Sequence, residues 1–356
     1  MSHSVFFCNY SVGPEAYREV PSICAPFGGR VLLLGGRRAL EAGRDRLEAA
    51  LKGSGLEIVD AQVYGADCTM ANIHKWAAHA RAVGADMIFG MGGGRALDTA
   101  KGAASEADLP FFTFPTIAAT CAGMTKLSVI YWEDGSQDHF AYAGRPPRHC
   151  FIDLEILAKA PAEYLQAGMG DTIGKFFECH FSARNDRLEH SSALGREISN
   201  MCYEPLREHG SQALADCKAD RVSLALEQAA LAIIVSTGLV STLVLDLYNG
   251  AVAHSTYYGM VTIPGFDETH RHGNVVSYGV LVQLMVDGDR EKALEVKAFL
   301  QSIGIHTTFR EMQVPLDREF MAPVLKAIVN APDMKHIPYP ITEDMIFQAM
   351  EAVEAL

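Results

Sequence analysis

A glycine-rich segment between an apolar run and a helix-forming stretch constrains the fold of this chain most strongly. Residues 87–89 are apolar, Gly92, Gly93 and Gly94 follow, and residues 95–101 favour a helix. Glycines let the backbone approach an anion, and the free N–H groups and the dipole of the following helix then face its charge. The segment therefore predicts a phosphate cradle, with a plain turn as the alternative. Its spacing fits neither Gly-x-Gly-x-x-Gly nor a P-loop.

Extended and helical patterns alternate through the first part of the chain. The expected strands lie at residues 31–34, 56–63, 87–89, 111–116 and 150–153, and the expected helices at residues 38–52, at residues 72–83 and directly after the glycines. Alternation of this kind predicts a parallel sheet covered by helices. A turn at residues 133–135 between two extended segments predicts an antiparallel hairpin appended to that sheet.

From about residue 154 onward the pattern is helical. Helical patterns cover residues 162–184, 187–208, 219–247, 272–287, 289–303 and 341–354. We therefore predict an α/β domain over residues 1–155 and an all-α domain over residues 156–356, with the active cleft between them. The uncharged stretch at residues 229–245 could mimic a membrane span, but its length and its Ser, Thr and Gly content favour a buried core helix.

Charge and cysteine content exclude several classes of partner. The chain has 43 acidic and 30 basic residues, a formal charge of -13, and no basic stripe. We therefore expect no nucleic acid and no membrane as partner. Its eight cysteines are scattered and form no Cys-x-x-Cys pair. This pattern is typical of reduced thiols in a cytoplasmic protein.

Three residues of the helical half could bind a divalent metal ion. Asp171, His254 and His272 offer one carboxylate and two imidazoles, which would leave open coordination positions, as in catalytic sites. Their spacing matches no short motif, and the chain has 13 histidines, so core or surface roles are the alternative for each. His270 competes with His272, and residue type does not decide between them.

Several motifs, taken in order, resemble the glycerol dehydrogenase branch of the metal-dependent, iron-containing alcohol dehydrogenases. They are GGGRALDTAK at residues 92–101, PTIAATCA at 115–122, LSVIY at 127–131, AGMGDT at 167–172, and His254 with the later His272-Gly273. Residues 116–122 and HIPYPI at residues 336–341 look more similar to the hydroxycarboxylate dehydrogenases, which reduce 2-oxo acids.

This resemblance implies a dehydroquinate synthase-like architecture, with the nucleotide on the N-terminal sheet and the metal on the helical domain. It makes Asp171, His254 and His272 the metal ligands, since the family uses the histidine just before the glycine. Its cofactor-binding positions are Gly92, Gly93, Gly94 and Arg95 at the pyrophosphate, and Thr116, Ile117, Thr125, Leu127 and Tyr131 along the groove. We also expect a small alcohol or carbonyl substrate and a homo-oligomer.

Three departures from the family affect substrate and metal. Cys121 stands where glycerol dehydrogenases carry an aspartate that recognises a polyol hydroxyl, which argues against glycerol. We expect Cys121 to be a neutral wall of the substrate pocket, with a nucleophile as the alternative. Tyr257 replaces a family histidine, so its hydroxyl is a candidate proton exit. Lys175 replaces a histidine of the iron enzymes, so we expect zinc rather than iron.

The end of the first predicted strand indicates which nicotinamide cofactor is used. An acidic residue there normally binds the ribose 2′-hydroxyl and repels a 2′-phosphate. Gly36 stands at that position in this chain, followed by Arg37 and Arg38. We therefore predict that NADP(H) is preferred over NAD(H). The alternative is that both arginines are solvated residues at the start of a helix.

These features together predict an oxidoreductase that interconverts an alcohol, with 2-hydroxy acids among the candidates, and its carbonyl compound. Arg271 and Lys175 are candidate cations for the carboxylate of a 2-oxo acid. Glycerol or another polyol is the alternative substrate. A metal- and NAD-dependent carbon–oxygen lyase or cyclase of the dehydroquinate synthase type is the rival class; it expects glutamate where Asp171 stands. A catalytically inactive nucleotide-binding protein is a third possibility.

Overall fold

The computed structural model describes residues 4–356, which form two compact units. The first unit combines the described part of Met1–Ala162 with Ala215–Thr242, and the second combines Glu163–Leu214 with Leu243–Leu356. The chain therefore returns to the first unit after entering the second. The expected domain boundary between residues 155 and 156 stays a prediction.

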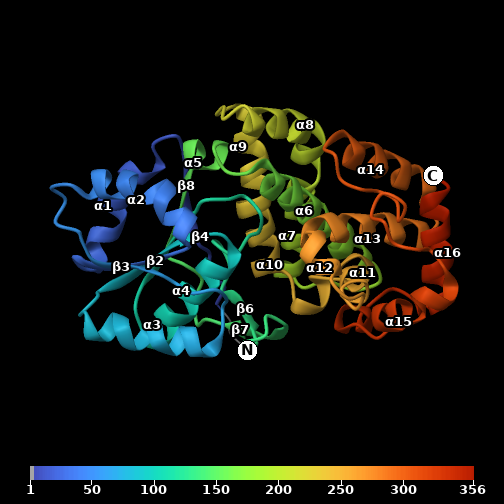
Figure 1. Cartoon of the computed structure of the whole chain (residues 1–356), viewed down its shortest axis with the longest axis horizontal. Helices are drawn as coiled ribbons and strands as arrows, with labels where there is room; N and C mark the ends of the chain where they lie inside the picture. Colours follow the sequence, from blue (N-terminus) through green and yellow to red (C-terminus); the bar gives the residue numbers. More distant parts are fainter. Residues whose placement is uncertain (1–3) are drawn as a thin grey trace. The chain divides into compact units, whose positions relative to one another are not determined.

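The first unit is built on a six-stranded parallel sheet with the strand order β1-β8-β5-β4-β2-β3 (Figure 1). Its strands are β1 Asn9–Gly13, β2 Arg30–Gly35, β3 Glu57–Val63, β4 Met87–Gly92, β5 Phe111–Pro115 and β8 His149–Asp153. The sequence pattern predicts all of them except β1. That strand lies at the edge of the sheet and is half-exposed, so it carries no apolar run.

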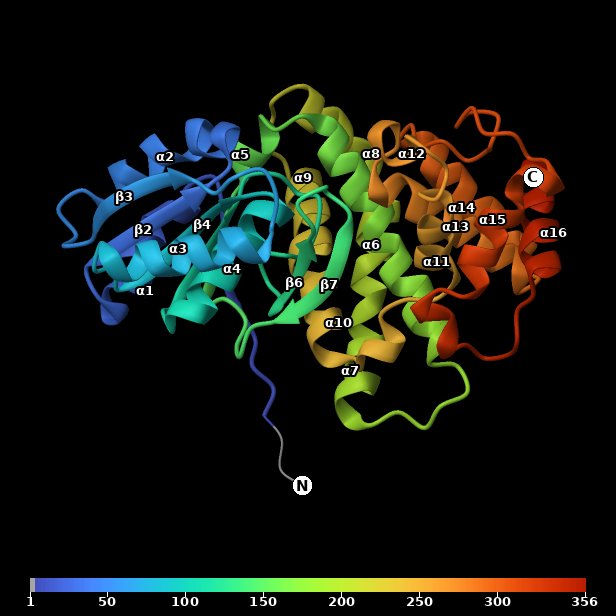
Figure 2. The same cartoon turned by 60° about the horizontal axis from the view of Figure 1, so that its bottom comes forward.

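Helices cover both faces of this sheet (Figures 1 and 2). The helices of the unit are α1 Val20–Cys24, α2 Arg37–Leu51, α3 Met70–Ala82, α4 Gly94–Ala107, α5 Leu154–Ala158, α9 Leu224–Leu231 and α10 Thr237–Leu243. Leu33 packs in one core with Leu47 of α2, whereas Leu32 and Leu34 pack in another with Trp76 of α3. Since neighbouring strand residues point to opposite faces, a continuous apolar run supplies both cores.

The predicted hairpin exists but does not extend the main sheet. Strands β6 Leu127–Tyr131 and β7 Gln137–Tyr142 pair antiparallel in a separate two-stranded sheet. Two buried side chains of α4 hold β6: Asp98 accepts a hydrogen bond from the Val129 amide at 3.1 Å, and Lys101 donates to the Leu127 carbonyl. The expectation of an appended hairpin is therefore wrong, because β6 is attached to a helix.

The second unit is helical. Its helices are α6 Ala162–Ser182, α7 His190–Ile198, α8 Glu204–Lys218, α11 Val252–Met260, α12 Phe266–Thr269, α13 His272–Val286, α14 Arg290–Ser302, α15 Arg318–Val329 and α16 Glu343–Glu354. The single helix expected over residues 187–208 is interrupted before Glu204, because Pro205 fits only the first turn of a helix. The sequence pattern does not predict α11, which is short, or α15, which contains Pro323.

Helices α9 and α10 are joined by the π-helical segment Ala232–Ser236. Within the described residues, the resulting stretch Leu224–Leu243 is the one helix long and apolar enough to cross a membrane, judged by length and composition. However, 61% of its most apolar window is buried in the protein. This burial supports the expected core helix.

Candidate functional site

Two glycines allow α6 and α13 to approach each other closely. A Cβ atom on Gly273 would lie 1.9 Å from the carbonyl oxygen of Ala167, and one on Gly170 would lie 2.4 Å from that of Gly273. No side chain fits at either position. Asp171 follows Gly170 in α6 and His272 precedes Gly273 in α13, so this helix crossing brings the two polar side chains together.

The structure brings all three predicted metal ligands together in the second unit. We call Asp171, His254 and His272 the donor group. Asp171 Oδ1 lies 3.2 Å from His272 Nε2 and 3.5 Å from His254 Nε2. One donor atom from each residue lies within 4.8 Å of the other two. A tetrahedral ion with protein bonds near 2.1 Å would separate its donor atoms by about 3.4 Å. The three residues therefore fit a single divalent ion.

His270, the competitor of His272, faces a different environment. Its ring stacks on Phe266, with ring centroids 4.2 Å apart and an interplanar angle of 9°. Among the residues that the structure describes, His270 is not part of the donor group around Asp171. The fold therefore favours His272 over His270 on geometry alone.

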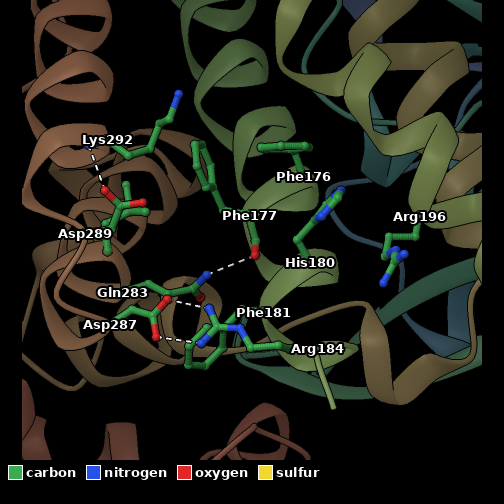
Figure 3. Close-up of a pocket in the computed structure, with 11 residues that line it drawn as sticks. Phe176, Phe177, His180, Phe181, Arg184, Arg196, Gln283, Asp287, Asp289 and Lys292 are labelled. Atoms are coloured by element: carbon green, nitrogen blue, oxygen red, sulfur yellow. Dashed lines mark hydrogen bonds and ion pairs between the residues drawn. The ribbon is translucent and has the colours of Figure 1, made fainter. Parts of the chain in front are cut away.

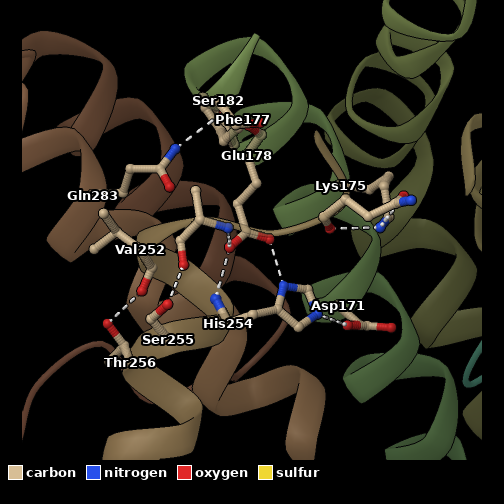
Figure 4. Close-up of polar contacts among 12 residues, drawn as sticks. Asp171, Lys175, Phe177, Glu178, Ser182, Val252, His254, Ser255, Thr256 and Gln283 are labelled. Carbon is tan, nitrogen blue, oxygen red and sulfur yellow. Dashed lines mark hydrogen bonds and ion pairs between the residues drawn. The ribbon is translucent and has the colours of Figure 1, made fainter. Parts of the chain in front are cut away.

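A buried carboxylate that carries no sequence motif, Glu178 of α6, holds His254 in place (Figure 4). Its Oε1 accepts hydrogen bonds from the backbone amides of Ala251 and His254, each at 2.7 Å, and its Oε2 contacts His254 Nδ1. An imidazole that donates from Nδ1 presents the lone pair of Nε2 on its other side. Here, Nε2 is the atom that faces Asp171. Glu178 lies seven residues after Asp171, a spacing that places both on one helix face and could have identified it.

The charges of this cluster shift its pKa values strongly. Burial acts to raise the pKa of Asp171 and Glu178, but His254 lowers both, and His272 adds to the effect at Asp171. Burial acts to lower the pKa of His254, but Glu178 and Asp171 outweigh it and raise that pKa to about 10. A metal ion therefore has to displace a proton from His254, so its binding is coupled to proton release.

The other predicted residues of this unit have partners of different kinds. Lys175 is buried, and its Nζ donates to the carbonyl and side-chain oxygens of Asn249 at 2.9 and 3.1 Å (Figure 4). The guanidinium of Arg271 lies over the Tyr164 ring and 3.3 Å from a Glu163 oxygen, with a side chain that is 42% exposed. Arg271 is therefore the more accessible of the two candidate cations. Tyr257 contacts His272 edge-on, with ring centroids 4.3 Å apart.

In the first unit, the strand order reverses between β2 and β4. The chain runs from β2 to β3 on one side, and β4, β5 and β8 follow on the other side. Parallel sheets bind ligands beyond the carboxyl ends of the strands at such a point. Here Gly36 follows the end of β2, and its amide donates to the Met91 carbonyl of β4 at 3.2 Å. The two glycine-rich strand ends thus meet at the edge where a nucleotide is expected.

The glycine loop itself is shorter than expected, because β4 continues to Gly92 and α4 begins at Gly94. Gly92 has a φ of +149°, and a Cβ atom there would lie 2.9 Å from that of Ala96. A Cβ atom on Gly93 would lie 2.6 Å from the side chain of Ile117. Gly92 therefore has to be glycine, whereas a side chain at Gly93 would have to displace the end of the Ile117 side chain. The N-terminus of α4 follows directly, as a phosphate cradle requires.

The remaining predicted cofactor residues surround this edge or the adjoining hairpin. Arg95 pairs with Asp67 at 2.6 Å, and its guanidinium lies 4.7 Å from the centre of the Tyr131 ring. Thr116 donates its backbone amide to the Gly92 carbonyl at 3.2 Å. Thr116 and Thr125 are buried, and Ile117, Leu127 and Tyr131 are half-buried. Their contacts with a nucleotide stay a prediction.

Two sequence features that concern specificity are accessible. Arg37 and Arg38 are exposed in the first turn of α2, which contains no acidic residue. Cys121 is half-buried between β5 and β6, and its Cβ lies 3.7 Å from a Cβ atom built on Gly238. No disulfide bond joins any of the eight cysteines among the residues that the structure describes.

Comparisons with known proteins show which family the chain resembles. The profile of the family described as iron-containing alcohol dehydrogenase matches residues 9–154. A glycerol dehydrogenase of Thermotoga maritima is 32% identical over 305 residues, which are 83% of this chain and 82% of that protein. Hydroxycarboxylate dehydrogenase A of Escherichia coli is 29% identical over 333 residues, which are 92% and 90% of the two chains.

A solved structure of a probable glycerol dehydrogenase from Sinorhizobium meliloti 1021 is 25% identical and matches with a TM-score of 0.85 over 99% of both chains. This match confirms the expected fold class, an α/β region followed by a helical region in the dehydroquinate synthase-like architecture. With a relative that is 32% identical over most of its length, the chain belongs to the iron-containing alcohol dehydrogenase family.

Proposed function

We propose that this member of a metal- and NAD(P)-dependent oxidoreductase family prefers NADPH and interconverts a 2-oxo acid and the corresponding 2-hydroxy acid. The observation that carries the proposal of metal-dependent catalysis is the cluster of Asp171, His254 and His272 backed by buried Glu178. Such a donor set leaves room for a substrate oxygen.

Each residue of the cluster has a separate proposed role in the reaction. A divalent ion bound there would act as a Lewis acid toward the substrate oxygen, and a nicotinamide would carry the hydride. Asp171 supplies a negative charge, and Glu178 keeps the proton of His254 on Nδ1, away from the donor atom. Tyr257, packed against His272, is the hydroxyl proposed to pass a proton to water.

The preference for NADPH is supported by Gly36, Arg37 and Arg38. No carboxylate lies in the first turn of α2, so nothing there repels a 2′-phosphate, and both guanidinium groups are exposed. Gly36 has extended dihedral angles, and a Cβ atom there would meet its nearest neighbour at 3.8 Å, so an aspartate fits. We expect Gly36→Asp to shift the ratio of kcat/KM for NADPH and NADH at least tenfold toward NADH.

Two further variants test this proposal without adding a carboxylate. Arg37→Ala should weaken NADPH selectively, whereas Arg44→Ala, on an exposed face of the same helix, should leave the ratio unchanged. A wild-type enzyme that prefers NADH tenfold would show that the arginines are only solvated residues.

The proposed substrate class rests on Cys121, a thiol in place of a carboxylate, and on the accessible cation Arg271. A screen of NADPH oxidation over 2-oxo acids, aldehydes, ketones and polyols tests it, with the metal content measured on the same preparation. We expect Arg271→Ala to lose activity on 2-oxobutyrate and to keep activity on a plain aldehyde. Equal losses on both substrates would contradict a role in carboxylate binding.

Polyol oxidation is the second candidate, because the relative from Thermotoga maritima is named a glycerol dehydrogenase. Cys121 argues against it, since this side chain cannot act as an anionic acceptor for a polyol hydroxyl unless it ionises. The lyase or cyclase alternative expects glutamate in place of Asp171. Net turnover of the nicotinamide, followed by its absorbance, distinguishes an oxidoreductase from an enzyme that uses the cofactor only transiently.

We further propose zinc as the metal, a homo-oligomer as the assembled form, and a reducing compartment such as the cytoplasm. Zinc is supported by the three-residue donor set, in which Lys175 binds Asn249 instead of adding a fourth ligand. The eight cysteines, none of which forms a disulfide in the described residues, support a reducing compartment. Elemental analysis and the mass of the purified protein in solution test the first two proposals.

A further inference from the structure

A cavity lies within the helical unit, apart from the donor group (Figure 3). Its volume is about 510 Å³, within the range of small-molecule sites. We call it the Gln283 cavity, after a residue of α13 that is 2% exposed. Its walls include the rings of Phe176 and Phe177 of α6, which lie edge-on with centroids 4.9 Å apart.

Unsatisfied polar atoms concentrate in this cavity. Among the described residues, six buried side-chain polar atoms lack both a hydrogen-bond partner and an ion-pair partner, and three of them belong to its lining. These are Gln283 Oε1, His180 Nε2 and Arg196 Nε. The Gln283 amide is oriented by a 3.0 Å hydrogen bond from Nε2 to the Phe177 carbonyl, so its oxygen is the free acceptor. Buried polar groups without partners are costly, and their convergence indicates a ligand that supplies them.

The charged residues of the lining leave one guanidinium without a close partner. Arg184 is bound by Asp287, Lys292 is bound by Glu295, and the carboxylate of Asp289 caps the first turn of α14. Arg196 lies 3.7 Å from a carboxylate oxygen of Glu197, whose side chain is 70% exposed. An anionic group can therefore bind Arg196 without displacing a tight ion pair.

The ring of His180, whose Nε2 is one of the three unsatisfied atoms, adds no positive charge that would compete with Arg196. Burial and the charge of Arg196 lower the pKa of His180, so its ring is neutral near pH 7. The ring also lies 4.5 Å from that of Phe176, which continues the aromatic wall. Among the described residues of its lining, the cavity thus offers one cation without a close partner, one amide oxygen without a partner, and flat apolar surface.

We propose that the Gln283 cavity binds a small aromatic carboxylic acid with a hydroxyl donor on its ring. Its carboxylate contacts Arg196, its ring packs against Phe176 and Phe177, and its hydroxyl donates to Gln283 Oε1. This site takes part in no step of the proposed reaction, and it shares only helices α6 and α13 with the donor group.

The test uses 4-hydroxyphenylacetate and isothermal titration calorimetry on the purified full-length protein. Phenylacetate lacks the donor and 4-hydroxybenzyl alcohol lacks the carboxylate, and we expect each to bind at least tenfold more weakly. Arg196→Met and Gln283→Leu should each weaken the acid at least tenfold. Arg207→Met, on the exposed face of α8, is the matched control and should not change its affinity.

A background of His272→Ala separates this cavity from the donor group, where a carboxylate could also bind. Affinity that survives His272→Ala and falls in Arg196→Met supports the proposal. Affinity that is lost in His272→Ala and kept in Arg196→Met overturns the proposal. The absence of saturable binding at millimolar concentrations also overturns it, and the cavity would then hold only water. Melting temperatures confirm that each variant is folded, and the two weaker probes test the proposal on the unaltered protein.

Discussion

Replacing Glu178 by glutamine tests how His254 is prepared for a metal ion. Glutamine has nearly the same volume, and its carbonyl oxygen can still accept from the backbone amides of Ala251 and His254. The other end of the side chain becomes an NH2 group that faces His254 Nδ1. Two donors then meet, and His254 relieves the clash by releasing its Nδ1 proton, while the proton on Nε2, the atom that faces Asp171, stays in place.

The magnitude follows from the single hydrogen bond that is changed. A hydrogen bond to a charged group contributes about 1.5 to 3 kcal/mol. Partners that orient a ligating histidine typically change metal affinity by about 10-fold to 100-fold. These ranges agree, since 1.4 kcal/mol corresponds to about tenfold in affinity. We therefore expect Glu178→Gln to bind zinc about 10 to 100 times more weakly than the wild-type protein.

Competition with a chromophoric chelator measures this affinity directly, without any activity assay. Asp153→Asn is the matched control, because Asp153 is also a fully buried carboxylate that accepts backbone hydrogen bonds. It pairs with Arg46 in the first unit, far along the chain from the donor group. This control should lose stability and keep its zinc affinity.

Zinc affinity within twofold of wild type in a folded Glu178→Gln protein would refute the reasoning. It would mean that the tautomer of His254 is set by the ion alone. A parallel loss of zinc affinity in Asp153→Asn would also refute it, because the effect would then report only general destabilisation.

Three further predictions address the crossing helices, the sheet and a buried ion pair. Gly273→Ala places a methyl group against the Ala167 carbonyl and should abolish zinc binding, whereas Gly144→Ala, with open space around it, should change stability by no more than about 0.5 kcal/mol. Burial lowers the pKa of His149 from 6.5 to about 4, so the unfolded chain binds a proton between these values and the folded chain does not. The free energy of unfolding should fall by up to about 3 kcal/mol as the pH drops from 6.5 to 4. Denaturant unfolding measured at several pH values should show a smaller decrease for His149→Gln. Lys101→Met leaves a buried carboxylate without its 2.8 Å partner and should cost about 3 to 5 kcal/mol of unfolding free energy.

Sequence patterns predicted the sheet because the signal is local. The run at residues 31–34 is apolar on both faces, and only a strand covered on both sides buries such a run. Local sequence patterns did not predict elements that are stabilised by residues distant in the sequence. The edge strand β1 pairs with β8 across most of the first unit's sequence, and the hairpin is positioned by Asp98 and Lys101, not by its own residues.

The same distinction holds for the donor group. Residue types nominated Asp171, His254 and two adjacent histidines, but neither spacing nor type separates His270 from His272. Glu178 carries no motif, and its function is visible only because α11 packs its backbone amides against α6. The two candidate cations also looked alike in sequence, until the structure placed Lys175 against Asn249 and left Arg271 accessible.

The sequence by itself determined the alternation of strands and helices, the glycines at the strand ends and the chemistry of the three donor side chains. These depend on backbone freedom, on periodicity and on residue type, which are properties of short segments. The tertiary structure alone decided which histidine meets Asp171 and which carboxylate supports it. Those outcomes depend on a helix crossing in which Gly170 and Gly273 allow backbone contact, and such contacts between residues about a hundred positions apart leave no local pattern.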